Sequence, residues 1–215
     1  MIVVIDYGLG NLRSVAKALE LAGAEVIVTN EPKKINDATA IVFPGVGAFS
    51  KGMENLEKLD ILPVLLKSIK NGTPFLGLCL GLQLLFTQSE EHGAHKGLDI
   101  IKGEVKRFTG KIKVPHMGWN QVKQRTENTC PTASVRRGEQ RTDLLKGVPD
   151  NSYFYFVHSY YVVPEDKSII STTTDYGIEF VSSIQKDNIF GLQFHPEKSS
   201  ELGLKLLSNF VSMLK

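Results

Sequence analysis

In the stretch Thr73-Pro74-Phe75-Leu76-Gly77-Leu78-Cys79-Leu80-Gly81 a short apolar run ends at a cysteine between two glycines, and this is the clearest indication of the fold. The pattern predicts a buried strand over residues 73–78 and a helical stretch over 80–87. Glycine on both sides of Cys79 permits the close backbone approach of a sharp strand-to-helix turn. Such a turn lifts a nucleophile above the C-terminal edge of a parallel sheet, where open α/β folds bind ligands. A cysteine that only packs between a strand and a helix would leave the same motif, so its surroundings must decide.

The part of the chain before this turn alternates strands with helices. Short β-branched runs predict strands over residues 2–6, 25–29 and 40–43, and periodic apolar positions predict helices over 11–22 and 61–70. Strands separated by helices are typical of βαβ units and a parallel sheet.

Beyond about residue 100 the pattern changes to strands joined by short turns. These strands are expected over residues 100–108, 120–123, 153–157, 168–173, 180–185 and 189–194, and a closing helix over 203–214. The polar segment 125–141, which contains Cys130, is interpreted as a surface loop or insertion without an assigned role. We expect one α/β domain over residues 1–215, an open mixed sheet with a mainly parallel core, antiparallel additions and helices on both faces.

Composition narrows the class of protein. The chain has 215 residues, of which 42% are hydrophobic and 22% charged, and its formal net charge is +2. That balance gives no electrostatic reason to expect nucleic acid or an anionic membrane as a partner. The N-terminus lacks the pattern of a signal peptide, and no run approaches the roughly 20 apolar residues of a membrane span. The two cysteines stand in unlike contexts, so we expect a cytoplasmic protein without a disulfide framework.

A base and its orienting carboxylate are predicted at Phe194-His195-Pro196-Glu197. Proline favours an extended residue before it, and residues i and i+2 of an extended segment project to the same side. Glu197 could therefore hold one ring nitrogen of His195 while the other faces a thiol. A surface turn with a solvated glutamate is the alternative when the motif is taken alone.

The remaining histidines are weaker candidates for the base, because none has a carboxylate two residues further on. His92 and His95 occupy a polar turn and are expected to face solvent, without enough neighbouring ligands for a metal. His116 is expected in a loop with a structural role. His158 follows a predicted strand and could line a pocket.

An oxyanion hole needs preorganised donors. The backbone N–H of Leu80, directly after the nucleophile, is one candidate. The loop Pro44-Gly45-Val46-Gly47 ends another predicted strand and could supply a second N–H, most simply from Gly47. An ordinary strand-ending turn would have the same composition.

Together these motifs resemble the class I, triad-type glutamine amidotransferases. The blocks that carry the resemblance span nearly the whole chain: Asp6-Tyr7-Gly8-Leu9-Gly10-Asn11-Leu12, Pro44-Gly45-Val46-Gly47-Ala48-Phe49, Gly77 to Phe86, Pro115-His116-Met117-Gly118-Trp119-Asn120, Tyr155-Phe156-Val157-His158-Ser159-Tyr160-Tyr161, and Gly191 to Ser200. The segment 125–141 is longer than the connection expected there, but it touches no motif.

The resemblance implies a reaction. Cys79 would attack the side-chain amide carbon of L-glutamine, His195 would protonate the departing ammonia, and Glu197 would orient His195. Gln83 would contact the amino-acid end of the substrate. Backbone around His158, Ser159 and Tyr160 would shape the pocket, and no metal or organic cofactor is implied.

The resemblance also implies a partner. It is strongest to members that serve histidine biosynthesis, which form a heterodimer with a separate (β/α)8-barrel cyclase subunit and pass ammonia to it. Asn11, Trp119, Tyr155 and Lys198 match stretches that face the cyclase. Core or rim packing would equally explain the two aromatic residues.

Three other functions remain open at this stage. The same chemistry could serve another acceptor, as in anthranilate, pyridoxal phosphate or purine nucleotide synthesis. A cysteine peptidase or small-molecule hydrolase on a related fold would need a base elsewhere and no contact like Gln83. An inactive interaction module would have no need of Cys79, His195 and Glu197 together.

Overall fold

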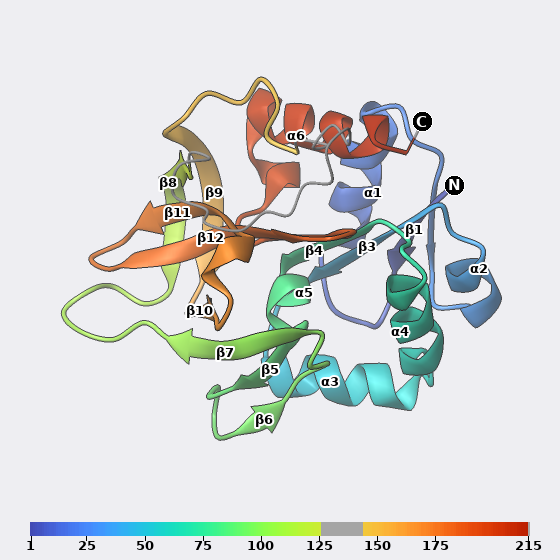
Figure 1. The fold of residues 1–215 in the computed structure, drawn as a ribbon, viewed down its shortest axis with the longest axis horizontal. Coiled ribbons are helices and arrows are strands. Elements are labelled where there is room, and N and C mark those ends of the chain that lie inside the picture. The colour runs from blue at the N-terminus through green and yellow to red at the C-terminus, as the bar shows by residue number, and fades with distance from the viewer. Residues whose placement is uncertain (126–143, 215) are drawn as a thin grey trace.

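A core of five parallel strands forms one half of the sheet, and its labelled strands lie toward the right-hand side of Figure 1. The computed structural model describes residues 1–125 and 144–214. Its core strands run in the order β2 (Val26–Thr29), β1 (Ile2–Ile5), β3 (Ala40–Gly45), β4 (Phe75–Cys79) and β13 (Ile189–Leu192), each parallel to its neighbour. The segment predicted to be a surface loop, 125–141 with Cys130, lies outside the described residues except for Arg125.

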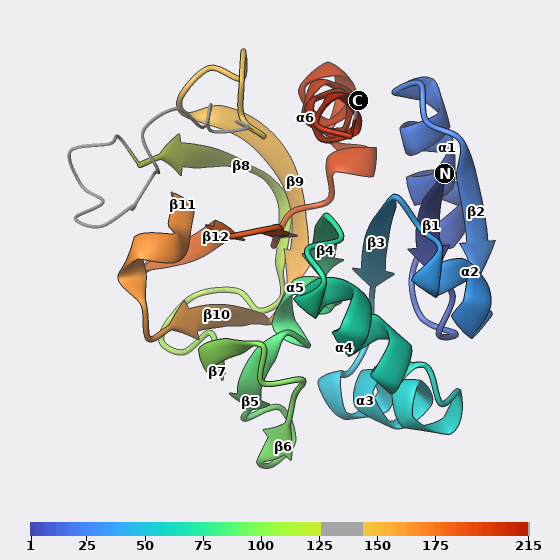
Figure 2. The ribbon, with the colours of Figure 1, turned by 45° about the vertical axis from the view of Figure 1, so that its right-hand side comes forward.

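Alternating side chains of the core strands are buried on opposite faces, because neighbouring residues of a strand point to opposite sides. Val3 and Phe43 join a cluster beneath α2 (Pro32–Asn36), α3 (Phe49–Lys58) and α4 (Leu62–Lys70). Val4 and Val42 join a second cluster beneath α1 (Leu12–Leu21) and α6 (Ser200–Ser212). Helices thus cover both faces, as predicted (Figure 2). The helices α2 and α3 were not predicted.

The strand β13 corrects one expectation. It was predicted among the antiparallel additions, but it lies parallel to β4, with Leu192 opposite Leu78. A turn at Asp187 and Asn188 makes it antiparallel only to β12 (Glu179–Lys186). All four of its residues are buried, as expected for a strand covered on both faces. The hairpin therefore delivers β13 into the parallel core.

The other half of the sheet is mostly antiparallel. From β12 the sheet continues through β10 (Tyr160–Pro164), β7 (Ile101–Arg107), β5 (Phe86–Ser89) and β6 (His95–Lys96). A branch leads from β12 to β11 (Ile170–Asp175), β8 (His116–Gln124) and β9 (Ser152–His158). The β5–β7 pair is parallel, an exception to the predicted antiparallel arrangement.

The helical stretch expected over residues 80–87 was also wrong in part. Helix α5 (Leu80–Gln83) makes a single turn, and the chain then enters β5. Leu84, Leu85 and Phe86 are completely buried. The carbonyl oxygens of Leu84 and Leu85 accept from backbone N–H groups of residues 98, 100 and 101, and Phe86 pairs with Ile101 of β7. No helix in the described ranges is both long and apolar enough to cross a membrane.

Candidate active site

The nucleophile candidate sits at the C-terminal edge of the parallel core. Cys79 ends β4 in a left-handed conformation with φ 52° and ψ −106°. Such backbone strain costs roughly 1–3 kcal/mol and is typical of functional sites. A Cβ atom on Gly81 would lie 1.7 Å from the carbonyl oxygen of Phe43, and one on Gly77 would lie 2.9 Å from that of Gly81. Both glycines are therefore required for the elbow, as the sequence predicted.

His195 and Glu197 form a buried pair beside this elbow. Nδ1 of His195 lies 2.9 Å from Oε1 of Glu197, and their side chains are only 3% and 2% exposed. The pairing was predicted, but its backbone geometry was not. Only His195 is extended, while Glu197 belongs to the 3-10 turn η3 (Pro196–Lys198), which folds the carboxylate back toward the ring.

The backbone of His195 is anchored to β9. Its N–H donates to the carbonyl oxygen of Tyr155 at 2.9 Å, and its carbonyl accepts from Oγ of Ser199 at 2.6 Å. Ser199 Oγ in turn accepts from the N–H of Tyr155 at 3.0 Å. These bonds fix the imidazole position from two elements.

The groups that surround His195 favour the protonated form of its imidazole. Burial lowers the pKa of His195, but interactions with Cys79 and Glu197 outweigh it and raise that pKa to about 10. Nε2 of His195 is buried and has no hydrogen bond of good geometry within the described residues. A cationic ring in this position can stabilise negative charge that develops on the sulfur during a reaction.

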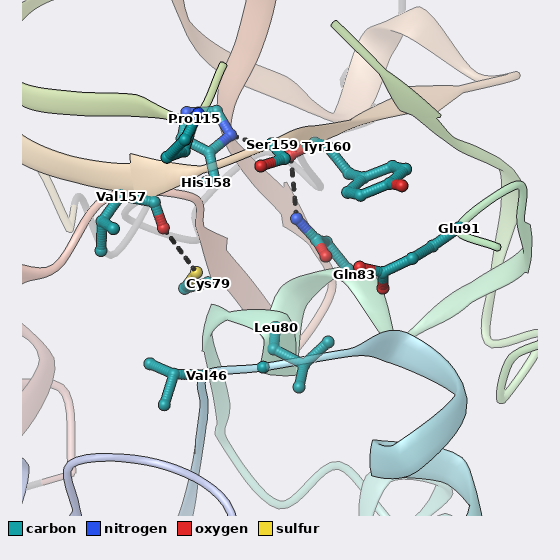
Figure 3. A pocket seen from close by; sticks show the side chains of 11 residues that line it. Val46, Cys79, Leu80, Gln83, Glu91, Pro115, Val157, His158, Ser159 and Tyr160 are labelled. Carbon is teal, nitrogen blue, oxygen red and sulfur yellow. Dashed lines mark hydrogen bonds between the residues drawn. The ribbon is translucent and has the colours of Figure 1, made fainter.

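A cavity of about 230 Å³ opens beside Cys79 (Figure 3). The cavity is lined by all the residues predicted for the oxyanion hole and for substrate binding: Gly47, Leu80, Gln83, His158, Ser159 and Tyr160. Gly47 has a φ of 111°, a conformation that favours glycine. His195 and Glu197 do not line the cavity.

The side chain of Gln83 has a defined orientation. Its Nε2 donates to the carbonyl oxygen of Tyr160 at 3.0 Å and to Oε1 of Gln193 at 3.2 Å. Because the amide nitrogen is used by these two acceptors, Gln83 has its carbonyl oxygen left for the cavity.

Glu91 is a cavity residue that sequence reasoning missed. It lines the cavity together with Gln83, and its Oε2 accepts from the backbone N–H of Phe49 at the start of α3. The sequence pattern puts Glu91 in a polar turn, and nothing in the sequence connects it to Phe49, which is 42 residues away. Its carboxylate gives the cavity an acidic wall.

His158 and His116 form a neutral buried pair. Nδ1 of His158 lies 2.8 Å from the carbonyl oxygen of Tyr160 and must donate to it. Nε2 of His158 then accepts from Nδ1 of His116 at 2.9 Å, and Nε2 of His116 accepts from Nδ2 of Asn120 at 3.2 Å. The contacts determine both tautomers. His116 was expected in a loop, yet it is the first residue of β8, because it pairs with His158 across the β8–β9 ladder.

Burial keeps this pair uncharged. It lowers the pKa of His116 to about 4 and that of His158 to about 3. Both ring nitrogens of His158 are occupied, so a ligand in the cavity would meet its backbone and ring carbons.

Three of the four residues predicted to face a partner form a cluster at the surface, in which Tyr155 is half-buried and the other two are exposed. Trp119 is 51% exposed and pairs with Tyr155 across β8–β9, with ring centroids 6.1 Å apart. Nζ of Lys198 lies 5.8 Å from the centroid of the Tyr155 ring. Asn11 is exposed directly before α1.

Comparison with known proteins identifies the class. The family model described as glutamine amidotransferase class-I matches residues 3–214. Two solved structures share the fold. One titled as a glutamine amidotransferase has a TM-score of 0.69 at 15% identity, covering 100% of this chain and 99% of the other. The other, PurLQS from Thermotoga maritima, has a TM-score of 0.68 at 20% identity, covering 100% and 98%. The chain belongs to the class I glutamine amidotransferase family.

Curated relatives narrow this further. The imidazole glycerol phosphate synthase subunit HisH of Aquifex aeolicus is 52% identical, covering 97% of this chain and 94% of that protein. The subunits of the same name from Moorella thermoacetica and Archaeoglobus fulgidus are 48% and 46% identical, each covering 100% of this chain and 95% and 100% of their own lengths. Within its family the chain groups with the HisH subunits.

Proposed function

We propose that this chain is the glutaminase subunit of an imidazole glycerol phosphate synthase. It hydrolyses L-glutamine to glutamate and ammonia through a thioester on Cys79. The observation that carries this proposal is the arrangement of Cys79 at a cavity wall, beside the buried His195–Glu197 pair. The similarity to HisH subunits over the full chain supports the pathway.

The proposed reaction has two stages. The thiolate of Cys79 attacks the side-chain amide carbon and forms a C–S bond. The C–N bond then breaks, and ammonia leaves with a proton from His195. A water molecule that gives a proton to His195 next attacks the thioester carbonyl, which releases glutamate and restores the sulfur. Glu197 keeps Nδ1 of the imidazole protonated, so that Nε2 exchanges the proton.

We assign the two ends of the glutamine substrate to different residues of the cavity. The carbonyl oxygen of Gln83 and the carboxylate of Glu91 are acceptors on one side of it (Figure 3). They suit the α-ammonium group of an amino acid. The backbone N–H groups of Leu80 and Gly47 are assigned to the oxyanion, because both residues line the cavity together with Cys79.

We propose that a cyclase partner uses the ammonia that this chain releases. A separate (β/α)8-barrel subunit would combine ammonia with a phosphoribosyl substrate, giving imidazole glycerol phosphate and an aminoimidazole carboxamide ribotide. The surface cluster of Trp119, Tyr155 and Lys198, with Asn11, is proposed to contact it. We place the enzyme in the cytoplasm, where a reactive thiol such as that of Cys79 stays reduced.

The test combines the chain, a candidate cyclase subunit and its phosphoribosyl ligand. Glutamate release from glutamine is measured for the wild type and for Cys79→Ala. Release that the ligand stimulates and the substitution abolishes is the expected result. Release that depends on Cys79 but ignores the cyclase would refute the partner and direct the search to another acceptor. Equal release by the wild type and Cys79→Ala would refute the nucleophile.

A further inference from the structure

Gln193 contacts the nucleophile and has no role in the proposed reaction. It follows β13 directly, and since Leu192 lies opposite Leu78, Gln193 lies opposite Cys79. Its side chain is completely buried, and its Nε2 lies 3.7 Å from Sγ of Cys79. Its backbone N–H donates to the carbonyl oxygen of Ser182 at 2.9 Å. The sheet therefore holds this amide against the sulfur.

The orientation of the Gln193 amide follows from its neighbours. Nε2 of Gln83 faces Oε1 of Gln193 at 3.2 Å and the carbonyl oxygen of Tyr160 at 3.0 Å. If the Gln193 amide were reversed, two NH₂ groups would face each other and the carbonyl would face the sulfur. The observed orientation gives a donor to every acceptor, so the NH₂ group of Gln193 must point to Cys79.

The other neighbours of the sulfur differ in what they offer a thiolate. The carbonyl oxygen of Val157, at 3.9 Å, can only accept from the neutral thiol. His195 supplies a positive charge, with Glu197 on its far nitrogen. The buried hydroxyl of Tyr7 has no hydrogen bond among the described residues, and burial, together with Cys79, raises its pKa. His158 is neutral.

We propose that Gln193 stabilises the thiolate of Cys79 through a hydrogen bond from its Nε2, and that it couples the nucleophile to Gln83 at the cavity wall. A hydrogen bond to a charged group is stronger than one to a neutral group, so the contact gains strength as the thiol loses its proton. The proposal rests on the role of Cys79 as nucleophile.

The test measures alkylation of Cys79 by iodoacetamide as a function of pH. Peptide mass spectrometry separates Cys79 from Cys130, and the plateau rate at high pH corrects for access to the cavity. Gln193→Leu removes the donor. Gln193→Glu keeps an acceptor for Gln83 but places a carboxylate against the sulfur. We expect about a tenfold slower alkylation at neutral pH for Gln193→Leu and a larger decrease for Gln193→Glu, with both pH profiles moved upward.

Asn188→Leu is the matched control. Asn188 precedes the same strand and donates its Nδ2 to the carbonyl oxygens of Ile69 and Thr73, at the opposite end of β4 from Cys79. Its loss should lower the melting temperature without moving the alkylation profile. A folded Gln193→Leu protein with the wild-type profile would overturn the proposal. If that variant fails to fold, an unchanged profile in Gln193→Glu overturns it instead.

Alkylation requires neither glutamine nor the cyclase. A chain without glutaminase activity whose alkylation still depends on Gln193 would therefore refute the proposed function but not this contact.

Discussion

Two buried histidine sites in this molecule differ in charge, because one is protonated and the other is neutral. His195 lies at the edge of the parallel core, against Glu197 and Cys79, and its pKa is raised to about 10. His116 and His158 lie on the antiparallel β8–β9 ladder, between a backbone carbonyl and the side chain of Asn120, and their pKa values fall to about 4 and 3.

The partners of each ring explain the difference, since all three side chains are almost completely removed from solvent. Burial alone disfavours the charged imidazolium, as it does at His116 and His158. At His195 the interactions with Cys79 and Glu197 reverse this effect of burial. The parallel core thus carries the ionic chemistry, while the antiparallel half supplies a rigid, neutral wall of the cavity.

The largest effect should come from removing the carboxylate at the charged site. In Glu197→Gln the amide cannot stabilise an imidazolium, and it can present the wrong group to Nδ1. We expect glutamate release in the liganded complex to fall by ~10³-fold, and the pKa of His195, measured by NMR, to decrease. Glu201→Gln, an exposed change on α6, is the control. Activity within a few-fold of the wild type in Glu197→Gln would argue against the orienting role.

Lowering the pH should destabilise the folded chain, because it favours protonation of the buried His116 and His158. The pKa values of His116 and His158 in the folded chain are below 6.5, so their contribution to stability is complete above pH 6.5 and decreases as pH falls toward 4. Two such groups predict a loss of about 4 kcal/mol in the free energy of unfolding between pH 7 and pH 5, of which His195 offsets about 1 kcal/mol. His195 has the opposite sign: its contribution is complete below pH 6.5 and disappears as pH rises through about 10.

Urea unfolding across this pH range measures the effect. Because many carboxylates titrate near pH 4, the comparison stops at pH 5. A free energy of unfolding that stays constant from pH 7 to pH 5 would mean that the two rings are not held neutral.

Removing His158 from the neutral His116–His158 pair should lower the free energy of unfolding slightly less than acidification does. His158→Phe retains a ring of similar size but leaves the carbonyl of Tyr160 and Nδ1–H of His116 without their partner. We expect a loss of about 2 kcal/mol in the free energy of unfolding at pH 7. The exposed substitution Tyr153→Phe on the same strand should change it by less than about 0.5 kcal/mol. Equal effects in the two variants would disprove the hydrogen-bonded chain.

Asn120→Asp should make His116 easier to protonate, as the neighbouring carboxylate does at His195. The substitution places a carboxylate at Nε2 of His116, where the amide of Asn120 donates at 3.2 Å. We expect the pKa of His116 to rise by about one unit or more, with a loss of roughly 1 kcal/mol in stability at pH 7. NMR titration of the imidazole carbons measures the pKa, with Asn30→Asp on the surface as the control. An unchanged titration of His116 would show that Asn120 does not set its state.

Several parts of the fold and the site were predictable because their causes are local. Glycines around Cys79 are needed by the elbow that they flank, and the core strands were located within about two residues by their β-branched runs. His195 and Glu197 are two positions apart, so their pairing depends on one short segment. Other features were missed because they depend on contacts across long distances in sequence. Examples are the early end of α5, the position of Glu91 and the pairing of His116 with His158.

The nucleophile elbow and the histidine with its carboxylate could be predicted from the sequence, since each resides in a few adjacent residues, and the family could be predicted from motifs spread over nearly the whole chain. The parallel pairing of β13 with β4 became visible in the three-dimensional fold alone, and this single pairing brings His195 and Gln193 to Cys79. Strand pairing depends on burial and hydrogen bonding over more than a hundred intervening residues, and the local pattern of an apolar strand is the same in either direction.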